Sequence, residues 1–314
     1  MSGKQIINND IQDITAGIIT NSVTVGSTIK AASHITGYNN DAIKIGEISN
    51  DSYIKIKSTP KKCSFKYLGN LNDIEALNYS SNTYQFHTAI KIGGGNYIYN
   101  NPLNLDPKAF NKYRETFKQF GLGIYTEIDL PNEKLGFTGK SNISGHLLDF
   151  SIGQYDTYTP IQLSQYITTL AAKGNRLKLN LLNKIINNNN KTIFKNEKEI
   201  LNKVETQEVY FNRTLEGLHE VLKPYGTGYN YIDYKYDPAG KTGTSQSFID
   251  TNNDDKIDTE TISSLFVGFA PFNNPKVTFT VINPDISYIN STEYTSFITK
   301  TITKRVSNAY FNRY

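Results

Sequence analysis

Three short stretches of this sequence carry side chains whose types and spacing could support nucleophilic chemistry. In the first, TVGSTIKAAS, Lys30 follows Ser27 by three positions. Residues three apart share one face of a helix, so the Lys30 amine could take a proton from the Ser27 hydroxyl. A serine at a helix N-terminus also lies where backbone N–H groups favour negative charge. The alternative is that Ser27 only caps the helix.

The same serine–lysine spacing recurs at Ser58 and Lys61. Here Pro60 lies between the two residues and disfavours a continuous helix, so their side chains need not share a face. We therefore take Ser27 and Lys30 as the candidate nucleophile and base, and the second pair as a chance occurrence.

The second stretch, NYSSNT, places a hydroxyl at Ser80 and an amide at Asn82. These groups could relay a proton and hold a substrate or a lysine by hydrogen bonds. The alternative is a polar turn or a helix cap.

The third stretch is AGKTGTSQ, with Lys241, Thr242, Gly243 and Thr244 at its centre. It is not a phosphate-binding loop, because the first glycine of that motif is missing and a strand is predicted to follow instead of a helix. A cationic edge strand is better suited to holding a carboxylate and a peptide backbone, because its glycine lets a ligand approach closely.

Composition excludes several classes of protein. The 314 residues are 38% hydrophobic and 20% charged, which is typical of a globular chain and not of a disordered one. A net charge of +4 is too weak to indicate a nucleic-acid partner. The single cysteine, Cys63, can form neither an internal disulfide nor a cysteine-based metal site. The histidines are scattered, which argues against a zinc hydrolase; they are His34, His87, His146 and His219.

Local patterns predict an α+β fold, with an antiparallel sheet flanked by helices. The predicted helices span residues 107–120, 160–174, 206–223 and 292–311, and the predicted strands span 241–249, 263–269 and 276–283. A further strand supplied before Ser27 would also fit. No run approaches the ~20 apolar residues of a membrane span, and we expect no signal peptide within the opening residues.

Taken in order, S-x-x-K, S-x-N and K-T-G-T resemble the signature of the penicillin-binding proteins and serine β-lactamases. Gaps of roughly 50 and roughly 160 residues between them resemble the transpeptidase domain of class B penicillin-binding proteins. Further blocks are similar to the same family: SIGQ at 151–154, TPIQL at 159–163 and FVGFAP at 266–271. The resemblance runs from about residue 17 to the C-terminus.

This resemblance implies a single transpeptidase domain over residues 1–314, with an about five-stranded antiparallel sheet flanked by helices and an all-helical portion. The pedestal domain and membrane anchor of class B proteins are expected upstream of this chain. The expected location is the extracytoplasmic face of a bacterial membrane, beside a membrane glycosyltransferase.

The resemblance also implies roles for the candidate residues. Ser27 would attack the carbonyl between the terminal D-alanines of a peptidoglycan stem peptide, with Lys30 as base. Ser80 would relay the proton to the departing D-alanine, and Asn82 would hold Lys30 and the substrate amide.

The remaining roles fall to the third motif. Backbone N–H groups of Ser27 and Thr244 would form the oxyanion hole. Lys241 would bind the terminal carboxylate, together with the hydroxyls of Thr242 and Thr244. Gly243, which has no side chain, would leave room for the substrate between them. A β-lactam would acylate the same serine, and no cofactor is required.

Two positions depart from the family pattern. Val25 stands where proline is usual, and Ile29 stands where phenylalanine is usual. Neither change removes a reacting group, but either could alter the shape of the pocket.

An acidic segment follows the third motif and resembles the first nine positions of a calcium loop. Its candidate ligands are Asp250, Asn252, Asp254 and Asp258. Asp255 stands where that loop has glycine, and Thr261 stands at its twelfth position. The alternative is an acidic hairpin tip in which Asp and Asn favour turns.

The leading interpretation is a D,D-transpeptidase of cell-wall synthesis. The alternatives within enzymes are a D-Ala-D-Ala carboxypeptidase and a serine β-lactamase. A β-lactamase would need a group poised to deacylate the serine, and no such group is evident in the sequence. A non-catalytic β-lactam sensor is the alternative outside enzymes.

Overall fold

The computed structural model describes residues 1–7, 10–252, 254, 256–289 and 297–313. Its centre is an antiparallel sheet of the order β13-β14-β15, formed by Ala239–Ile249, Thr259–Ala270 and Val277–Tyr288. β14 lies in the middle and is buried over most of its length, whereas β13 is an edge strand. The three strands that the sequence predicts are confirmed, and each extends beyond at least one predicted end.

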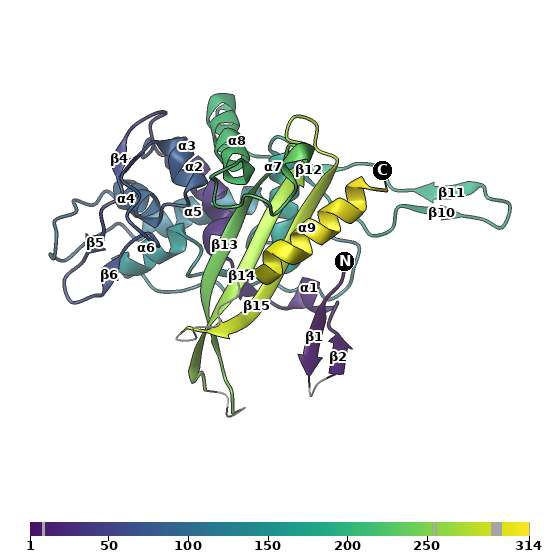
Figure 1. Cartoon of the computed structure of the whole chain (residues 1–314), viewed down its shortest axis with the longest axis horizontal. Helices are drawn as coiled ribbons and strands as arrows, with labels where there is room; N and C mark the ends of the chain where they lie inside the picture. Colours follow the sequence, from purple (N-terminus) through teal and green to yellow (C-terminus); the bar gives the residue numbers. More distant parts are fainter. Residues whose placement is uncertain (8–9, 253, 255, 290–296, 314) are drawn as a thin grey trace.

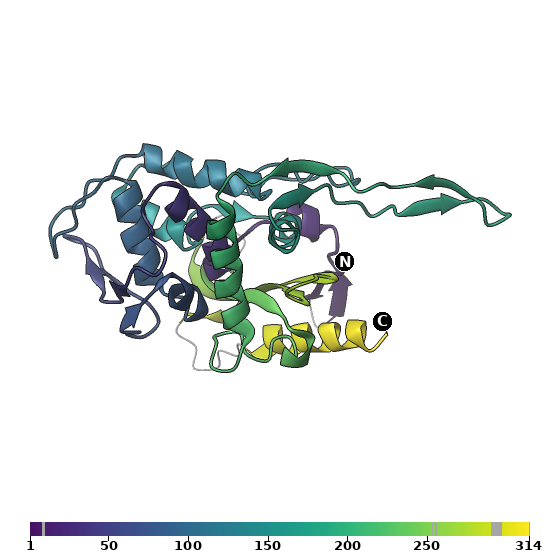
Figure 2. The same ribbon diagram turned by 90° about the horizontal axis from the view of Figure 1, so that it is seen from above.

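Helices cover both faces of this sheet (Figures 1 and 2). α9, Phe297–Phe311, packs against β14 and β15, as does α7, Pro160–Ala171. α7 begins as predicted, because Thr159 and Gln162 form a reciprocal capping box and Pro160 occupies the first turn. The final helix is confirmed over 297–311, and the first residues of its predicted range lie outside the described part of the chain.

A mainly helical portion, which also holds short strand pairs, packs beside the sheet, on the left and at the top of Figure 1. The all-helical character that the resemblance implies is therefore only approximate. This portion contains α2 Lys30–Asn39, α3 Asp73–Asn78, α4 Asn82–Ile92, α5 Lys108–Gln119, α6 Ser144–Ser151 and α8 Glu208–Leu222. α5 buries the aromatic stripe that predicts it, formed by Phe110, Tyr113 and Phe117. One large cluster of buried side chains runs from Val25 to Phe269 and joins the helices to the sheet.

The α+β class is confirmed, but the central sheet has three hydrogen-bonded strands among the described residues, fewer than the predicted five or so. β3, Val23–Thr24, lies beside β13 yet pairs with β8, Thr157–Tyr158. Side chains link β3 to β13 instead of a backbone ladder: Ser245 Oγ donates to the Thr24 carbonyl at 2.7 Å, and Thr24 Oγ1 donates to the Gln246 carbonyl at 2.8 Å.

Short elements complete the chain. They are β1 Lys4–Ile7, β2 Asp10–Asp13, α1 Gly17–Thr20, β4 Ser49–Asn50, β5 Ile54–Lys55, β6 Lys61–Lys62, β7 Asn70–Leu71, β9 Asn175–Leu177, β12 Ile200–Lys203 and the 3₁₀ helices η1 Gly26–Ile29 and η2 Tyr234–Tyr236. β10 Lys184–Ile186 and β11 Thr192–Lys195 form a narrow arm that projects from the body (Figures 1 and 2).

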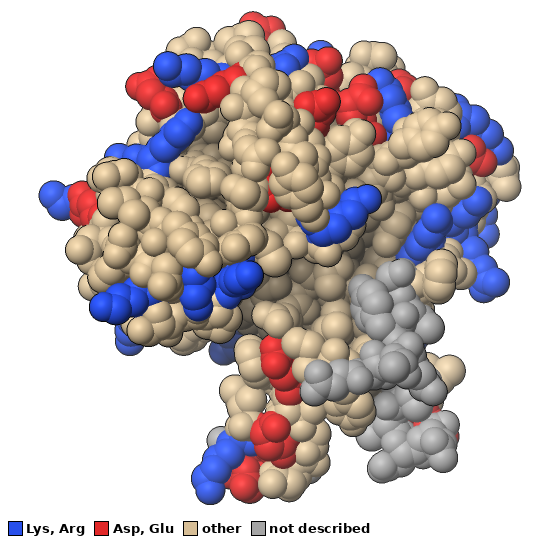
Figure 3. Space-filling model, turned by 60° about the vertical axis from the view of Figure 1, so that its left-hand side comes forward, with Lys and Arg blue, Asp and Glu red and all other residues tan. Residues whose placement is uncertain are grey.

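Positive and negative side chains are intermixed over the face drawn in Figure 3, with broad uncharged areas between them. This agrees with the small net charge of the sequence. Within the described ranges, no helix has the length and apolar character needed to cross a bilayer.

Candidate active site

Ser27 lies on a short 3₁₀ turn, Gly26–Ile29, that leads directly into α2. Gly26 has φ 51°, and a Cβ at this position would lie 2.4 Å from the Thr244 carbonyl oxygen. Only glycine lets the turn approach β13 so closely. The turn therefore places Ser27 against the edge strand that carries the third motif.

The Ser27 side chain does not cap α2. Neither this helix nor the preceding 3₁₀ turn has a side-chain cap, and Ser27 Oγ has no hydrogen-bond partner among the residues that the structure describes. Its side chain is half-buried. The capping alternative is therefore wrong, and the hydroxyl is free for other contacts.

Lys30 is fully buried at the start of α2. Its Nζ donates to the Ser80 carbonyl at 2.7 Å and to Asn82 Oδ1 at 2.7 Å, and lies 3.3 Å from Ser80 Oγ. Burial, followed by the nearby charge of Lys241, holds the pKa of Lys30 well below its ordinary value. The first two motifs thus meet at one buried amine, and its lowered pKa favours the neutral form.

Local structure explains why Ser80 and Asn82 are free to bind Lys30. The cap of α4 is supplied by Ser81, whose hydroxyl accepts a hydrogen bond from the Tyr84 N–H at 2.9 Å. Ser80 adopts the left-handed region with φ 59°. Asn82 uses its Oδ1 for Lys30 and its Nδ2 for the Cys63 carbonyl, at 3.1 Å.

The third motif, Lys241 to Thr244, lies on β13. This strand is at the edge of the sheet, which confirms the edge strand that the sequence predicts. Lys241 is fully buried, and burial lowers its pKa to about 7. Thr242 and Thr244 share the other face of the strand, half-buried and exposed respectively. Gly243 packs on the nucleophile turn, because a Cβ there would lie 2.6 Å from the Thr28 methyl group.

The two departures from the family pattern lie beneath the nucleophile turn. Val25 and Ile29 are both fully buried in the main core. The Val25 carbonyl accepts hydrogen bonds from the hydroxyl and N–H of Thr28, at 2.8 and 3.4 Å. Both residues act on the underside of the turn, away from the reacting groups.

The second serine–lysine pair is not part of this site. Ser58 lies in a turn with φ 60°, and Lys61 lies on the short strand β6, with its ammonium over the Tyr53 ring. The two residues share no helix, as Pro60 predicts.

The acidic segment after β13 makes the hydrogen bonds expected of a hairpin tip, which is the alternative to a calcium loop. Asp250, Asn252 and Asp254 each accept a hydrogen bond from the backbone N–H two residues on. Asp258 accepts from Thr251, and Asp255 lies outside the described residues.

Among the positions that the structure covers, no three His, Cys, Asp or Glu side chains come together as a metal site. Calcium binding stays a prediction. Calorimetric titration tests it, and no heat at about millimolar calcium would reject it.

The sequence interpretation missed the groups behind the Ser80–Asn82 turn. Asp51 is 4% exposed and accepts hydrogen bonds from the hydroxyls of Ser64 and Ser81. The Ser64 hydroxyl in turn accepts from the Asn82 N–H at 2.9 Å. No spacing in the sequence links Asp51 to the motifs, because its contacts arise only when the loop folds over α4.

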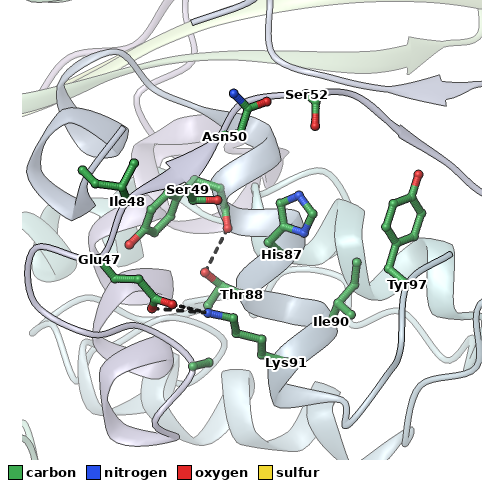
Figure 4. A pocket seen from close by; sticks show the side chains of 12 residues that line it. Glu47, Ile48, Ser49, Asn50, Ser52, His87, Thr88, Ile90, Lys91 and Tyr97 are labelled. Carbon is green, nitrogen blue, oxygen red and sulfur yellow. Dashed lines mark hydrogen bonds and ion pairs between the residues drawn. The ribbon is translucent and has the colours of Figure 1, made fainter. Parts of the chain in front are cut away.

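A cavity of about 470 Å³ is lined in part by residues next to Asp51 (Figure 4). Its walls come from residues 42–52 and from α4, with His87 and Tyr97 facing the interior and a Glu47–Lys91 ion pair at 3.3 Å. None of the candidate catalytic residues lines it. Asn50 and Ser52 do, so the cavity adjoins the loop that carries Asp51.

Known proteins similar to this chain belong to the family that the motifs indicate. Residues 1–308 match the family described as "Penicillin binding protein transpeptidase domain". The chain is 38% identical to penicillin-binding protein 2A of Bacillus subtilis, covering 99% of this chain and 45% of that protein. It is 27% identical to the peptidoglycan D,D-transpeptidase MrdA of Escherichia coli, over 68% of this chain and 34% of that protein.

Solved structures agree with these matches. Penicillin-binding protein 2B of Streptococcus pneumoniae strain R6 superposes with a TM-score of 0.86 at 26% identity, covering 100% of this chain and 52% of that one. The chain thus spans about half the length of its relatives or less. The fold and the extent of the family match lead to one assignment: this chain belongs to the penicillin-binding protein transpeptidase domain family.

Proposed function

We propose that this domain is a serine D,D-transpeptidase that cross-links peptidoglycan stem peptides through an acyl-enzyme on Ser27. The observation that carries the proposal is the buried Lys30 amine, held by Ser80 and Asn82 at the base of the Ser27 turn. A relative whose name includes D,D-transpeptidase supports the same reaction.

Lys30 is the base in this proposal. A lysine amine accepts a proton only when neutral, and burial beside Lys241 favours its neutral form. Ser27 Oγ would attack the carbonyl carbon between the two D-alanines as its proton passes to Lys30. Ser80 Oγ, 3.3 Å from Lys30 Nζ, would then pass a proton to the nitrogen of the departing D-alanine.

Substrate binding falls to the edge strand. The terminal carboxylate of the stem peptide would lie at Lys241 and the hydroxyls of Thr242 and Thr244, and its charge would favour the protonated form of Lys241. The backbone N–H groups of Ser27 and Thr244 would stabilise the oxyanion, with about 3–4 kcal/mol from each donor. The close approach of Gly26 to Thr244 supports this pairing.

An amine from a second stem peptide would take the acyl group from Ser27 and close the cross-link. The same serine would open a β-lactam ring and retain the adduct. We also propose that the domain works at the extracytoplasmic face of a bacterial membrane, beside a membrane glycosyltransferase. Support for this location and partner comes from the family resemblance, and co-purification with a candidate glycosyltransferase tests it.

Penicillin acylation tests the proposed nucleophile. Intact mass after incubation with benzylpenicillin should show one adduct per chain, and peptide mapping should place it on Ser27. Ser27→Ala should abolish the adduct, whereas Ser58→Ala, at the second serine–lysine pair, should retain it. Labelling of Ser27→Ala would overturn the site assignment.

Turnover separates the enzyme alternatives. A transpeptidase should hydrolyse nitrocefin only slowly after one equivalent, because the acyl-enzyme persists. Rapid repeated hydrolysis would instead identify a β-lactamase. Release of D-alanine from a stem pentapeptide without any dimeric product would identify a carboxypeptidase, and acylation with no reaction on peptides would identify a sensor.

A further inference from the structure

Asp51 is a buried carboxylate with no role in the proposed reaction. It is 4% exposed and lies in the loop after β4. A buried carboxylate must be compensated by hydrogen bonds or opposite charge. Its carboxylate accepts hydrogen bonds from neutral donors: the hydroxyls of Ser64 and Ser81 on Oδ1, the former at 2.7 Å, and the Leu68 N–H on Oδ2 at 3.2 Å.

Both hydroxyls also accept hydrogen bonds from the start of α4. Ser64 Oγ accepts from the Asn82 N–H at 2.9 Å, and Ser81 Oγ accepts from the Tyr84 N–H at 2.9 Å. A hydroxyl whose proton points to a carboxylate has its lone pairs free for such donors. Asp51 therefore orients two acceptors toward the first N–H groups of α4.

Asn82, the first residue of α4, and Ser80, which precedes the helix, in turn hold Lys30. Asn82 Oδ1 and the Ser80 carbonyl each accept from Lys30 Nζ at 2.7 Å. Ser80 has φ 59°, a conformation that a serine keeps only when its surroundings enforce it. An unbroken path of hydrogen bonds thus runs from Asp51 through Ser64 to Asn82 and the amine.

We propose that Asp51 is a positioning residue, whose buried carboxylate fixes the turn bearing Ser80 and Asn82 against the amine of Lys30. This inference rests on the proposed function. Asp51 touches no reacting atom and acts through the hydroxyls of Ser64 and Ser81. It also places a negative charge behind the base, which gives its role a signature that a purely structural residue lacks.

The charged and titratable groups that face Lys30 are Lys241 on β13, His34 on α2 and Asp51. Lys241 and burial lower the pKa of Lys30, whereas Asp51 raises it. Burial lowers the pKa of His34 to about 4, so this ring is neutral near pH 7. Asp51 also faces His87 on α4, whose pKa is lowered by burial and by Lys91.

The negative charge of Asp51 therefore predicts how Asp51→Asn changes the pKa of Lys30. Without the carboxylate, the pKa of Lys30 falls further, and Lys30 becomes neutral at lower pH. The acid limb of the acylation profile, where the rate rises as the base loses its proton, should move to lower pH. The plateau rate should fall about 10–100-fold, as is common when a group that orients an active-site residue is removed.

The experiment measures the second-order rate of Ser27 acylation by benzylpenicillin against pH, in wild type, Asp51→Asn and Ser64→Ala. Ser64→Ala is the matched control, because it breaks the same path but keeps the charge. It should lower the plateau and leave the acid limb in place. Thermal melting of each variant confirms that it is folded.

Two results overturn the inference: a plateau within about two-fold of wild type in Asp51→Asn, or a lower plateau with an unmoved acid limb. If Asp51→Asn does not fold, Ser64→Ala decides, since a wild-type rate there overturns the path and a reduced rate supports it. Absence of wild-type acylation at Ser27 would instead reject the proposed function. The two failures are therefore distinguishable.

Discussion

Lys30 is buried among oxygen atoms that carry no charge. The Ser80 carbonyl and Asn82 Oδ1 accept hydrogen bonds from its Nζ, but no carboxylate contacts it among the described residues. A carboxylate in contact would hold the proton on the amine, whereas neutral acceptors orient the amine and still let the proton leave. This environment suits a base.

Lys30→Arg tests this role at the scale of the residue. Arginine keeps the positive charge and the hydrogen-bond donors, but it cannot lose its proton in a protein. Acylation by penicillin should fall about 10²–10⁴-fold, the usual contribution of a general base. Lys61→Arg is the matched control and should retain the wild-type rate, and a wild-type rate in Lys30→Arg would exclude Lys30 as the base.

The order and spacing of a family signature predict residues that the structure brings together: Lys30 contacts Ser80 and Asn82. Their roles in a reaction stay a prediction. The sequence also separated Ser27 from Ser58, since Pro60 breaks the second pair. It could not identify Asp51 or Ser64. Their contact depends on a loop folding back on α4, and an isolated aspartate or serine in a polar loop carries no pattern.

At the scale of the element, the nucleophile turn depends on a glycine that lies far away in the sequence. Gly153 has φ 81°, and its carbonyl accepts a hydrogen bond from the Gly26 N–H at 2.9 Å. A Cβ at Gly153 would lie 2.2 Å from the Gly26 carbonyl oxygen. The loop after α6 therefore forms one wall of the Ser27 turn.

Gly153→Ala should disturb both stability and chemistry. We expect a loss of about 1–3 kcal/mol from the left-handed conformation, with a further loss from the backbone contact. Acylation should slow because Gly26 must move. Gly94→Ala is the matched control: Gly94 has φ 64° with no atom within 4 Å of an added Cβ, so only strain remains.

Chemical denaturation and the penicillin acylation rate measure these two effects. Gly94→Ala should lose stability and keep the wild-type acylation rate. Equal acylation rates in the two variants would show that Gly153 does not support the turn.

Elements were predictable where the signal is local. The capping box at Thr159 and the aromatic stripe of α5 gave their helices correctly. The number of strands in the central sheet was not predictable in this way. β3 is two residues long and joins β13 through hydroxyl groups, and neither feature produces an alternating pattern.

At the scale of the whole molecule, the fold buries two lysines at the site. Lys30 and Lys241 are both fully buried, and the charge of Lys241 lowers the pKa of Lys30. Burying ammonium groups without a paired carboxylate opposes folding. The free energy of unfolding is therefore lower than it would be with neutral side chains at these positions. The two lysines of the site cause this loss of stability.

The same burial makes stability depend on pH. The pKa of Lys241 is about 7 in the folded protein and returns to its ordinary value of 10.5 on unfolding. Between these values the unfolded chain binds more protons, so stability rises with pH across that window. Below about pH 7 Lys241 is protonated in both the folded and the unfolded chain, and its buried charge lowers the free energy of unfolding by the full amount.

Lys241→Met removes this charge while keeping a long side chain. At pH 7 the variant should be about 1–3 kcal/mol more stable than wild type, and its stability should rise less between about pH 7 and pH 10. Part of the rise should remain, because Lys30 is buried in the same way. Urea unfolding at several pH values measures both effects. Lys118→Met, on the exposed face of α5, should follow the wild-type curve, and equal slopes in wild type and Lys241→Met would contradict the argument.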